Sequence, residues 1–367
     1  MKVLQWCRAN AMPVIAVLAA AVTAVFVPPD SAYLGYYDVK TLSCLFCILA
    51  VVCALRGAGL FPLLAQRLVR AFHTARSAVT ALVVVTLIGS MLLTNDTALL
   101  TFLPLSWFVL EGTGQTKHTA LTFILQNCAA NLGGMLTPFG NPQNLYLFNH
   151  YTIPNGEFLT IMLPPFLLST ALILACCLLI PREMLTVPAQ ETPVDKRRCI
   201  VYGVLFCTAA AMVLRGIPYW LGLAAITAAL LVLDRRALLG VDWGLLVTFA
   251  AFFTFSGNMA RIEPVRTLFR QLLAHGTMPV AVLTSQVISN VPAAILLSQF
   301  TDDYPALLVG VNIGGAGTLV ASLASLITFR EYTKHVKGQA GRFLALFSAV
   351  SFGFLAVLLA AMTFLTQ

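Results

Sequence analysis

The sequence predicts an all-α polytopic membrane protein built from two inverted repeats, each with a re-entrant hairpin and a discontinuous helix. Three observations support this fold class: the composition, a series of long apolar segments, and a helix-breaking motif that occurs twice. Of the 367 residues, 59% are hydrophobic and 10% are charged, whereas soluble proteins are about 25% charged. We therefore expect the chain to reside in lipid.

Continuous apolar runs give the positions of the predicted spans. A bilayer core requires about 20 helical residues, and shorter segments occur where the membrane thins. Such runs lie near 12–27, 41–56, 158–181, 199–214, 217–233, 242–257 and 342–365. The first resembles a signal peptide, but because the rest of the chain is itself a membrane protein, we expect it to be retained as an N-terminal helix.

Two further apolar segments carry a polar break at their centre. Residues 77–110 are interrupted by Thr-Asn-Asp-Thr, and residues 278–300 are interrupted by Ser-Asn-Val-Pro. The second segment is too short for two spans, and polar backbone at membrane depth is tolerated only where it lines a cavity. We therefore predict two re-entrant hairpins whose polar tips face a water-filled cavity.

A related motif follows each hairpin. Residues 131–144 read NLGGMLTPFGNPQN and residues 312–325 read NIGGAGTLVASLAS, so each begins with Asn, an apolar residue and two glycines. Adjacent glycines favour local unwinding, which predicts broken helices at 118–148 and 305–329. Interrupted segments at corresponding positions of two halves are typical of secondary transporters, and they mark the binding site.

The polar segment 182–198 divides the chain into two halves. The first repeat with its N-terminal helix covers 1–181, and the second covers 199–367. Most Lys and Arg residues fall on one side if both hairpins are re-entrant, which places the N-terminus in the cytoplasm. The hairpins then enter from opposite sides of an inner or plasma membrane, so the repeats are inverted.

Asp96 is the one carboxylate that this topology places deep in the membrane. A charged group there costs about 2.5–3.5 kcal/mol, so it marks a functional site. It either ligates Na⁺ or carries a proton, and a helix cap is the structural alternative. No Lys or Arg is expected near the tips, so amides, hydroxyls and helix N-termini would meet an anion. We expect no enzymatic activity, no cofactor beyond the coupling ion, and no nucleic-acid partner.

These segments resemble the ion transporter superfamily, which includes divalent anion/sodium symporters, arsenite permeases and citrate transporter-like proteins. TNDTALLTFLP (94–104) is similar to the arsenite-permease hairpin, and NLGGMLTPFGNPQN is similar to the Gly-rich segment of the same group. Ser289-Asn290 matches the start of the Ser-Asn-Thr tip of dicarboxylate symporters, with Val291 in place of the Thr. The resemblance covers both repeats, roughly 41–181 and 217–365.

The resemblance implies a homodimer in which a mobile domain carries the hairpins in an elevator movement. It implies one sodium site at Thr94, Asn95, Asn131, Gly133, Thr137 and Asn141. It implies a second at Ser289, Asn290, Asn312, Gly314, Thr318 and Ser322. The anion would lie between the tips, and the expected substrate-binding residues are Asn95, Asp96, Thr97, Asn144, Asn290, Val291, Pro292 and Ser325.

The expected function is transport of a small anion, either a di- or tricarboxylate or an inorganic oxyanion, coupled to Na⁺ or H⁺. The alternative is a Na⁺/H⁺ antiporter that uses Asp96 as the exchanging carboxylate, because a titrating carboxylate can exchange a proton for sodium.

Overall fold

The protein is helical throughout the part of the chain that the structure describes. A computed structural model describes residues 11–59, 73–184 and 195–365, so residues 185–194 of the predicted linker lie outside it. Within these ranges, extended pairing is limited to one isolated bridge between Thr74 and Met184. The all-α prediction is therefore confirmed for the described ranges.

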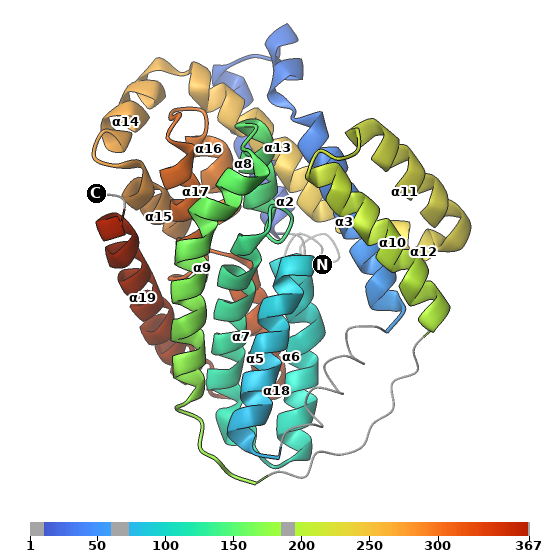
Figure 1. The fold of residues 1–367 in the computed structure, drawn as a ribbon. Coiled ribbons are helices and arrows are strands. Elements are labelled where there is room, and N and C mark those ends of the chain that lie inside the picture. Colours follow the sequence, from blue (N-terminus) through green and yellow to red (C-terminus); the bar gives the residue numbers. More distant parts are fainter. Residues whose placement is uncertain (1–10, 60–72, 185–194, 366–367) are drawn as a thin grey trace.

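One group of helices stands to one side of the molecule. Helix α2 (Ala11–Phe26) leads through the short turn η1 (Ser31–Tyr36) into α3 (Val39–Gly57). Helix α3 packs against α10 (Lys196–Val213), α11 (Tyr219–Leu233) and α12 (Arg235–Leu239), on the right of Figure 1.

Helix α13 (Trp243–Arg261) packs along α2 and continues into the amphipathic helix α14 (Glu263–Leu273).

Both predicted hairpins are pairs of helices joined by a short break. The first consists of α5 (Ala75–Leu92) and α6 (Asn95–Gly112), and the second of α15 (Thr277–Ile288) and α16 (Asn290–Leu297). The second chain reversal occurs at Ser289, whose φ of 77° is left-handed. A non-glycine residue in that region costs about 1–3 kcal/mol and is typical of functional sites.

The segment after each hairpin is a broken helix. The first is α7 (Thr119–Gly133), followed by the turn η3 (Gly134–Leu136) and, after an irregular stretch, by α8 (Pro142–His150). The second is α17 (Tyr304–Ile313), which resumes as α18 (Leu323–His335). The turn η2 (Thr116–His118) and the helices α9 (Asn155–Cys177) and α19 (Ala340–Leu365) complete the described chain.

The two halves interlock through these broken helices. Helices α5, α6 and α7 lie in the lower half of Figure 1, whereas α15, α16 and α17 lie in the upper half. Helix α18 nevertheless packs on α6 and α7, and α8 packs on α16 and α17. Each broken helix therefore ends against the hairpin of the other half, so both breaks and both tips meet near the centre.

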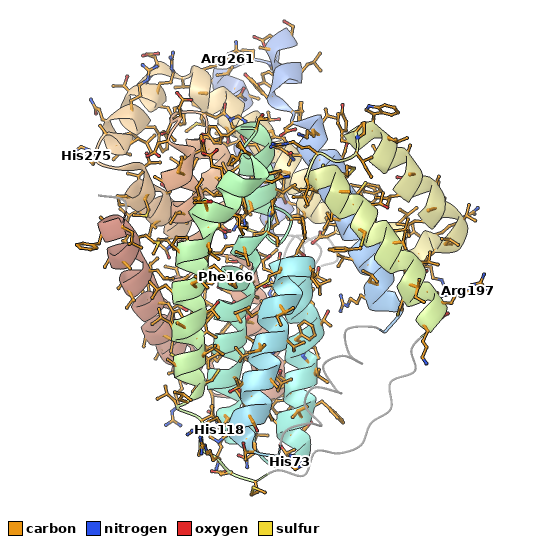
Figure 2. The ribbon with its side chains drawn as sticks, viewed as in Figure 1. His73, His118, Phe166, Arg197, Arg261 and His275 are labelled. Carbon is orange, nitrogen blue, oxygen red and sulfur yellow. The ribbon has the colours of Figure 1, made fainter. Side chains whose placement is uncertain are left out.

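The distribution of side chains agrees with a membrane protein. By length and apolar composition, five of the described helices can span a bilayer: α3, α5, α9, α13 and α19. In Figure 2 the labelled His73 and His118 lie at the lower end and Arg261 and His275 at the upper end, while Phe166 lies midway along α9.

The first hairpin is longer than the second, because α5 alone reaches 18 residues whereas α15 has 12.

Candidate functional site

The first hairpin tip is fixed to the break in the first broken helix. The backbone N–H of Asn95 donates to the carbonyl of Gly140 at 3.3 Å, and the Thr137 hydroxyl donates to the carbonyl of Met91 at 2.8 Å. The side chain of Asn95, the first residue of α6, accepts from the N–H of Asp96 at 2.9 Å. Hydrogen bonds from both sides therefore hold the tip against the unwound segment.

The second tip makes the corresponding contacts. The N–H of Asn290 donates to the carbonyl of Ala321 at 3.0 Å, and the Thr318 hydroxyl donates to the carbonyl of Gln286 at 3.0 Å. The Asn290 side chain accepts from the N–H of Val291 at 2.9 Å. Because each residue occupies the position of its counterpart in the first motif, the sequence repeat is also a repeat of contacts.

The two predicted glycine ligands have a packing role. A Cβ atom on Gly133 would lie 2.8 Å from the Ser90 hydroxyl and 2.9 Å from the Leu87 carbonyl. A Cβ atom on Gly314 would lie 2.9 Å from the Cβ atom of Ser285. These distances are too short for any side chain, so both glycines allow the hairpin helix to approach the broken helix closely.

Asn131 joins the first tip to the second half of the chain. Its Oδ1 accepts from the Asn95 side-chain amide at 3.1 Å and from the Ser322 hydroxyl at 2.8 Å. All three side chains are buried. A buried polar group is stable only when it is hydrogen-bonded, so this arrangement fixes the relative position of the tip and both broken helices.

Asn312 is the counterpart of Asn131 and is more extensively bonded. Its Oδ1 accepts from the side-chain amides of Asn141 at 3.2 Å and Gln143 at 3.3 Å. Its own amide donates to Asn144 Oδ1 at 2.6 Å. The pairing of Asn141 with Asn312 corresponds to that of Ser322 with Asn131, so the two halves exchange equivalent hydrogen bonds. Gln143 was not singled out in the sequence, although it lies within the repeated motif.

A cavity of about 340 Å³ lies between the two tips. The predicted site residues on its wall are Asn95, Asp96, Ser289, Asn290, Val291, Pro292 and Ser322. A neighbouring cavity of about 140 Å³ is lined by Thr94, Asp96 and Thr97, and the two threonine hydroxyls are 2.9 Å apart. The structure thus brings residues of both predicted tips to one space.

The structure does not bring Asn144 and Ser325 to either of these cavities. The Asn144 amide donates to the backbone carbonyls of Met135 and Thr137, at 3.1 and 3.3 Å. The Ser325 hydroxyl accepts from the Asn127 amide at 3.3 Å. Both side chains are fully buried in the polar network. They hold the hydrogen-bond network next to the cavities, and their expected contact with the substrate stays a prediction.

The N-termini of four helices meet at the cavity between the tips. Helices α6, α8 and α16 begin at Asn95, Pro142 and Asn290, and α18 begins directly after Ser322, its N-cap; all four residues line the wall. The N–H groups of Asn95, Asp96, Asn290 and Val291 already donate within the protein, so these helix ends offer the partial positive charge of the helix dipole. The cavity is therefore suited to an anion.

The expectation that no basic residue lies near the tips is wrong. The exposed side chain of Arg330 lines the cavity between the tips, and that of Arg56 lines the smaller neighbouring cavity. Arg330 lies in the last half of α18, eight positions after the N-cap Ser322. Only the packing of α18 against the first hairpin brings it to the site, so its sequence position gave no signal.

Two carboxylates also face this space. Asp96 Oδ1 is buried and has no hydrogen-bond partner among the described residues. Asp96 does not cap α6, because the N-cap position belongs to Thr94. The second carboxylate, Asp242, lines both cavities and accepts from the N–H of Leu245 at 2.9 Å, which caps α13.

Comparisons with known proteins agree with this arrangement. A family model described as citrate transporter matches residues 3–305. An uncharacterized transporter of Methanocaldococcus jannaschii is 31% identical over 327 residues, which are 88% of each chain. The inner membrane protein YbiR of Escherichia coli is 31% identical over 281 residues, which are 74% of each chain.

A third relative is similar over a shorter stretch. The silicon efflux transporter LSI3 of Oryza sativa subsp. japonica is 35% identical over 155 residues, which are 41% of this chain and 31% of that protein. The family match extends over most of the chain, and these findings confirm the resemblance to the ion transporter superfamily. The chain is thus an integral membrane transporter rather than an enzyme, and it belongs to the citrate transporter family.

Proposed function

We propose that the protein is a secondary active transporter that moves a small anion, either a di- or tricarboxylate or an inorganic oxyanion. The observation that carries this proposal is the meeting of four helix N-termini and Arg330 on one cavity of about 340 Å³. The helix dipoles offer positive potential to carboxylate or oxyanion oxygens, and the guanidinium offers charge and hydrogen bonds. The volume lies at the lower end of the range for ligand pockets, about 300–1,000 Å³.

The charge of Asp96 gives a physical reason for coupling. An ionised carboxylate and an anion in one cavity repel each other, and a bound Na⁺ or proton at Asp96 removes that repulsion. The cation and the anion then bind more tightly together than apart, and this effect is reciprocal. For sodium, the oxygens of the two predicted sites are the proposed ligands. Among them, Asn141 Oδ1 is buried without a hydrogen-bond partner in the described part of the chain.

The interlocked halves support an elevator movement of inverted repeats. The hairpins lie in opposite halves of Figure 1, and helices α3, α10, α11 and α12 form a separate group. We propose this group as the fixed scaffold of a homodimer in an inner or plasma membrane, with the N-terminus in the cytoplasm. The apolar side chains of Ile200, Trp220 and Val232 are exposed on it, as a lipid or dimer contact requires.

A Na⁺/H⁺ antiporter is the second candidate. The buried and unpartnered Asp96 Oδ1 favours it, because such a carboxylate can exchange a proton for sodium. The four helix N-termini favour an anion instead, so the two candidates differ in whether transport requires an anionic substrate.

Transport into proteoliposomes tests the proposal, with Na⁺ and pH gradients imposed separately. Citrate, a dicarboxylate, arsenite, sulfate and phosphate are the anions, and silicic acid is included because one relative is a silicon efflux transporter. We expect uptake of at least one anion to require a Na⁺ or H⁺ gradient. Na⁺/H⁺ exchange that needs no anion and is lost in Asp96→Asn would establish the antiporter instead.

Arg330→Gln tests the anion site directly. We expect this substitution to raise KM for the transported anion about tenfold, because it removes a positive charge from the cavity wall. The unfolding midpoint should stay unchanged, because the Arg330 side chain is exposed. Arg342→Gln is the matched control, since Arg342 is also exposed but lines neither cavity. Equal KM values in the two variants would exclude Arg330 from anion binding.

A further inference from the structure

A second polar cavity lies near η1, away from the two tips. Its volume is about 330 Å³, and its wall includes Tyr36, Asp38, Asn149 and Gln299. One side of the wall belongs to η1, the start of α3 and α13, and the other to α8 and the end of α16. This cavity shares no lining residue with the one between the tips.

Asn149, a residue of this wall, has an unused acceptor. The residue is 7% exposed, and its side-chain amide donates to the Thr41 hydroxyl at 3.2 Å. The N–H of Thr41 donates in turn to Asp38 Oδ1 at 2.9 Å, so the position of Asn149 is fixed by the start of α3. Its Oδ1 is buried and has no hydrogen-bond partner among the described residues. A buried acceptor of this kind requires a donor or a cation.

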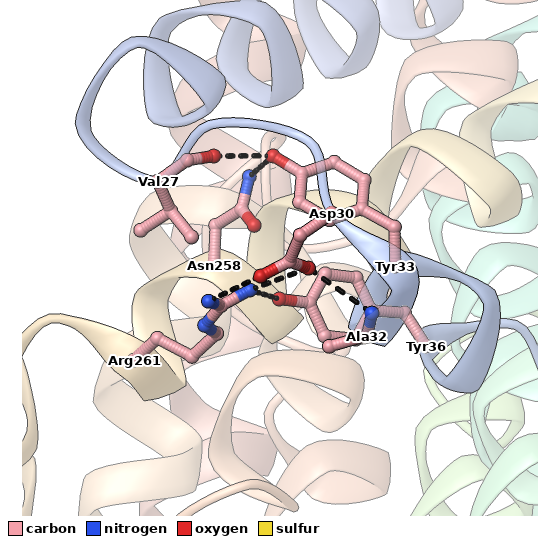
Figure 3. A network of polar contacts seen from close by, with 7 residues as sticks. All are labelled: Val27, Asp30, Ala32, Tyr33, Tyr36, Asn258 and Arg261. Carbon is pink, nitrogen blue, oxygen red and sulfur yellow. Dashed lines mark hydrogen bonds and ion pairs between the residues drawn. The ribbon is translucent and has the colours of Figure 1, made fainter.

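The charge around the cavity is negative. Among the described residues, Asp38 is the one carboxylate on the wall, and no Lys or Arg belongs to its lining. The nearest basic side chain on α13, Arg261, is paired with Asp30 at 2.7 Å and also donates to the Tyr36 hydroxyl at 3.1 Å (Figure 3). The same ion pair holds the pKa of Asp30 below its ordinary value. Arg261 is thus paired with Asp30, whereas Asp38 accepts hydrogen bonds from the N–H and hydroxyl of Thr41 and has no ion pair among the described residues.

The aromatic rings of the wall present edges and hydroxyls more than open faces. The Tyr36 ring lies between Tyr33, at a centroid distance of 5.0 Å, and Gly257, on which a Cβ atom would lie 2.5 Å from the ring. The Tyr146 ring is stacked on His150 at 5.1 Å and contacts Phe253 at 5.5 Å. Cation–π binding needs a free ring face, so oxygen atoms are the groups left to hold a cation.

We propose that this cavity binds a partly hydrated alkali cation through Asp38 and Asn149 Oδ1, with water completing its coordination. Hard cations take carboxylate, amide and hydroxyl oxygens, and divalent cations usually take several carboxylates. Here one carboxylate lines the wall, and no group of three His, Cys, Asp or Glu residues forms a metal site in the described ranges. The volume leaves room for an ion with several waters, each of which occupies about 30 Å³.

Because the site lies between two groups of helices, a bound cation would stabilise their present arrangement. The oxygens of the site come from α3 on one side and from α8 on the other, and α3 belongs to the group proposed as the scaffold. A bound cation links the two sides and stabilises the arrangement seen here. Binding to the folded state alone raises its stability by RT ln(1 + [Na⁺]/Kd), which makes thermal unfolding a direct measure of the site.

The test compares unfolding midpoints in NaCl and in N-methylglucamine chloride at equal ionic strength, on purified protein in detergent. All variants are made in an Asn95→Ala, Asn290→Ala background, which removes one ligand from each of the two proposed tip sites. We expect this background to retain a Na⁺-dependent rise in the midpoint, and Asp38→Asn and Asn149→Ala each to reduce that rise by at least half. Asp38→Asn keeps the N-cap of α3, because Asn and Asp cap helices equally well.

Asp302→Asn is the control, since it removes an exposed carboxylate outside this cavity and should leave the rise unchanged. No Na⁺-dependent rise in the background protein, or a rise undiminished in both variants, would overturn the proposal. The readout is binding rather than transport. A protein that carries no anion but shows the expected shifts therefore refutes the proposed function and keeps this site.

Discussion

Replacing Asn131 and Asn312 by Ala should cost different amounts of stability, although the two residues occupy the same position in the repeated motif. Asn131→Ala leaves the Asn95 amide and the Ser322 hydroxyl without their acceptor. Both of those residues line the cavity between the tips, so water can replace the lost partner. Each such hydrogen bond is worth about 0.5–1.5 kcal/mol, so we expect a total loss of about 1–3 kcal/mol.

Asn312→Ala leaves the Gln143 amide and Asn144 Oδ1 unpaired, while Asn141 keeps its bond to the Asn131 carbonyl at 3.1 Å. Gln143 and Asn144 are buried and line neither cavity of the site, so water does not reach them. Leaving a buried group unsatisfied costs about 1–3 kcal/mol, which gives about 2–6 kcal/mol for the two groups.

Thermal unfolding in one detergent at one scan rate measures this difference, since membrane proteins often unfold irreversibly and only matched scans are comparable. We expect the midpoint to fall in the order wild type, Asn131→Ala, Asn312→Ala. Asn155→Ala is the control, because Asn155 is exposed and makes one hydrogen bond of 3.3 Å to the Leu214 carbonyl. Equal midpoints for Asn131→Ala and Asn312→Ala, or the reverse order, would refute the role assigned to cavity water.

Two further predictions concern the backbone and the end of α13. Gly140→Ala should abolish transport and lower the unfolding midpoint, since its Cβ atom would lie 2.7 Å from the Thr137 hydroxyl and 2.9 Å from the Ser90 carbonyl. Gly156→Ala is the control: a Cβ atom there meets open space, so transport and the unfolding midpoint should stay unchanged. The depressed pKa of Asp30 predicts that its ion pair with Arg261 stabilises the protein above the ordinary pKa of 3.8 and that this contribution disappears as the pH falls below it. The difference in unfolding midpoint between wild type and Arg261→Gln should therefore be constant near neutral pH and shrink below pH 3.8. A difference that does not depend on pH would contradict a stabilising role of the ion pair.

The sequence by itself predicted the helices and their interruptions. The run 118–148 contains the break between α7 and α8, and the run 305–329 contains the break between α17 and α18. Hydropathy, adjacent glycines and prolines are local properties, so they act on the backbone wherever the segment lies in the fold. The repeated Asn-apolar-Gly-Gly motif likewise indicated that two tips and two breaks belong to one site.

The tertiary structure decided which side chains share that site. Arg330 and Asp242 line the cavity although they are far from both tips in the sequence, whereas Asn144 and Ser325 lie within the motifs but do not line it. A motif fixes where the backbone unwinds, but the direction in which each side chain points depends on the helices packed against it. The interlocking of α18 with the first hairpin and of α8 with the second sets those directions, because contacts between residues more than a hundred positions apart exist only in the folded chain.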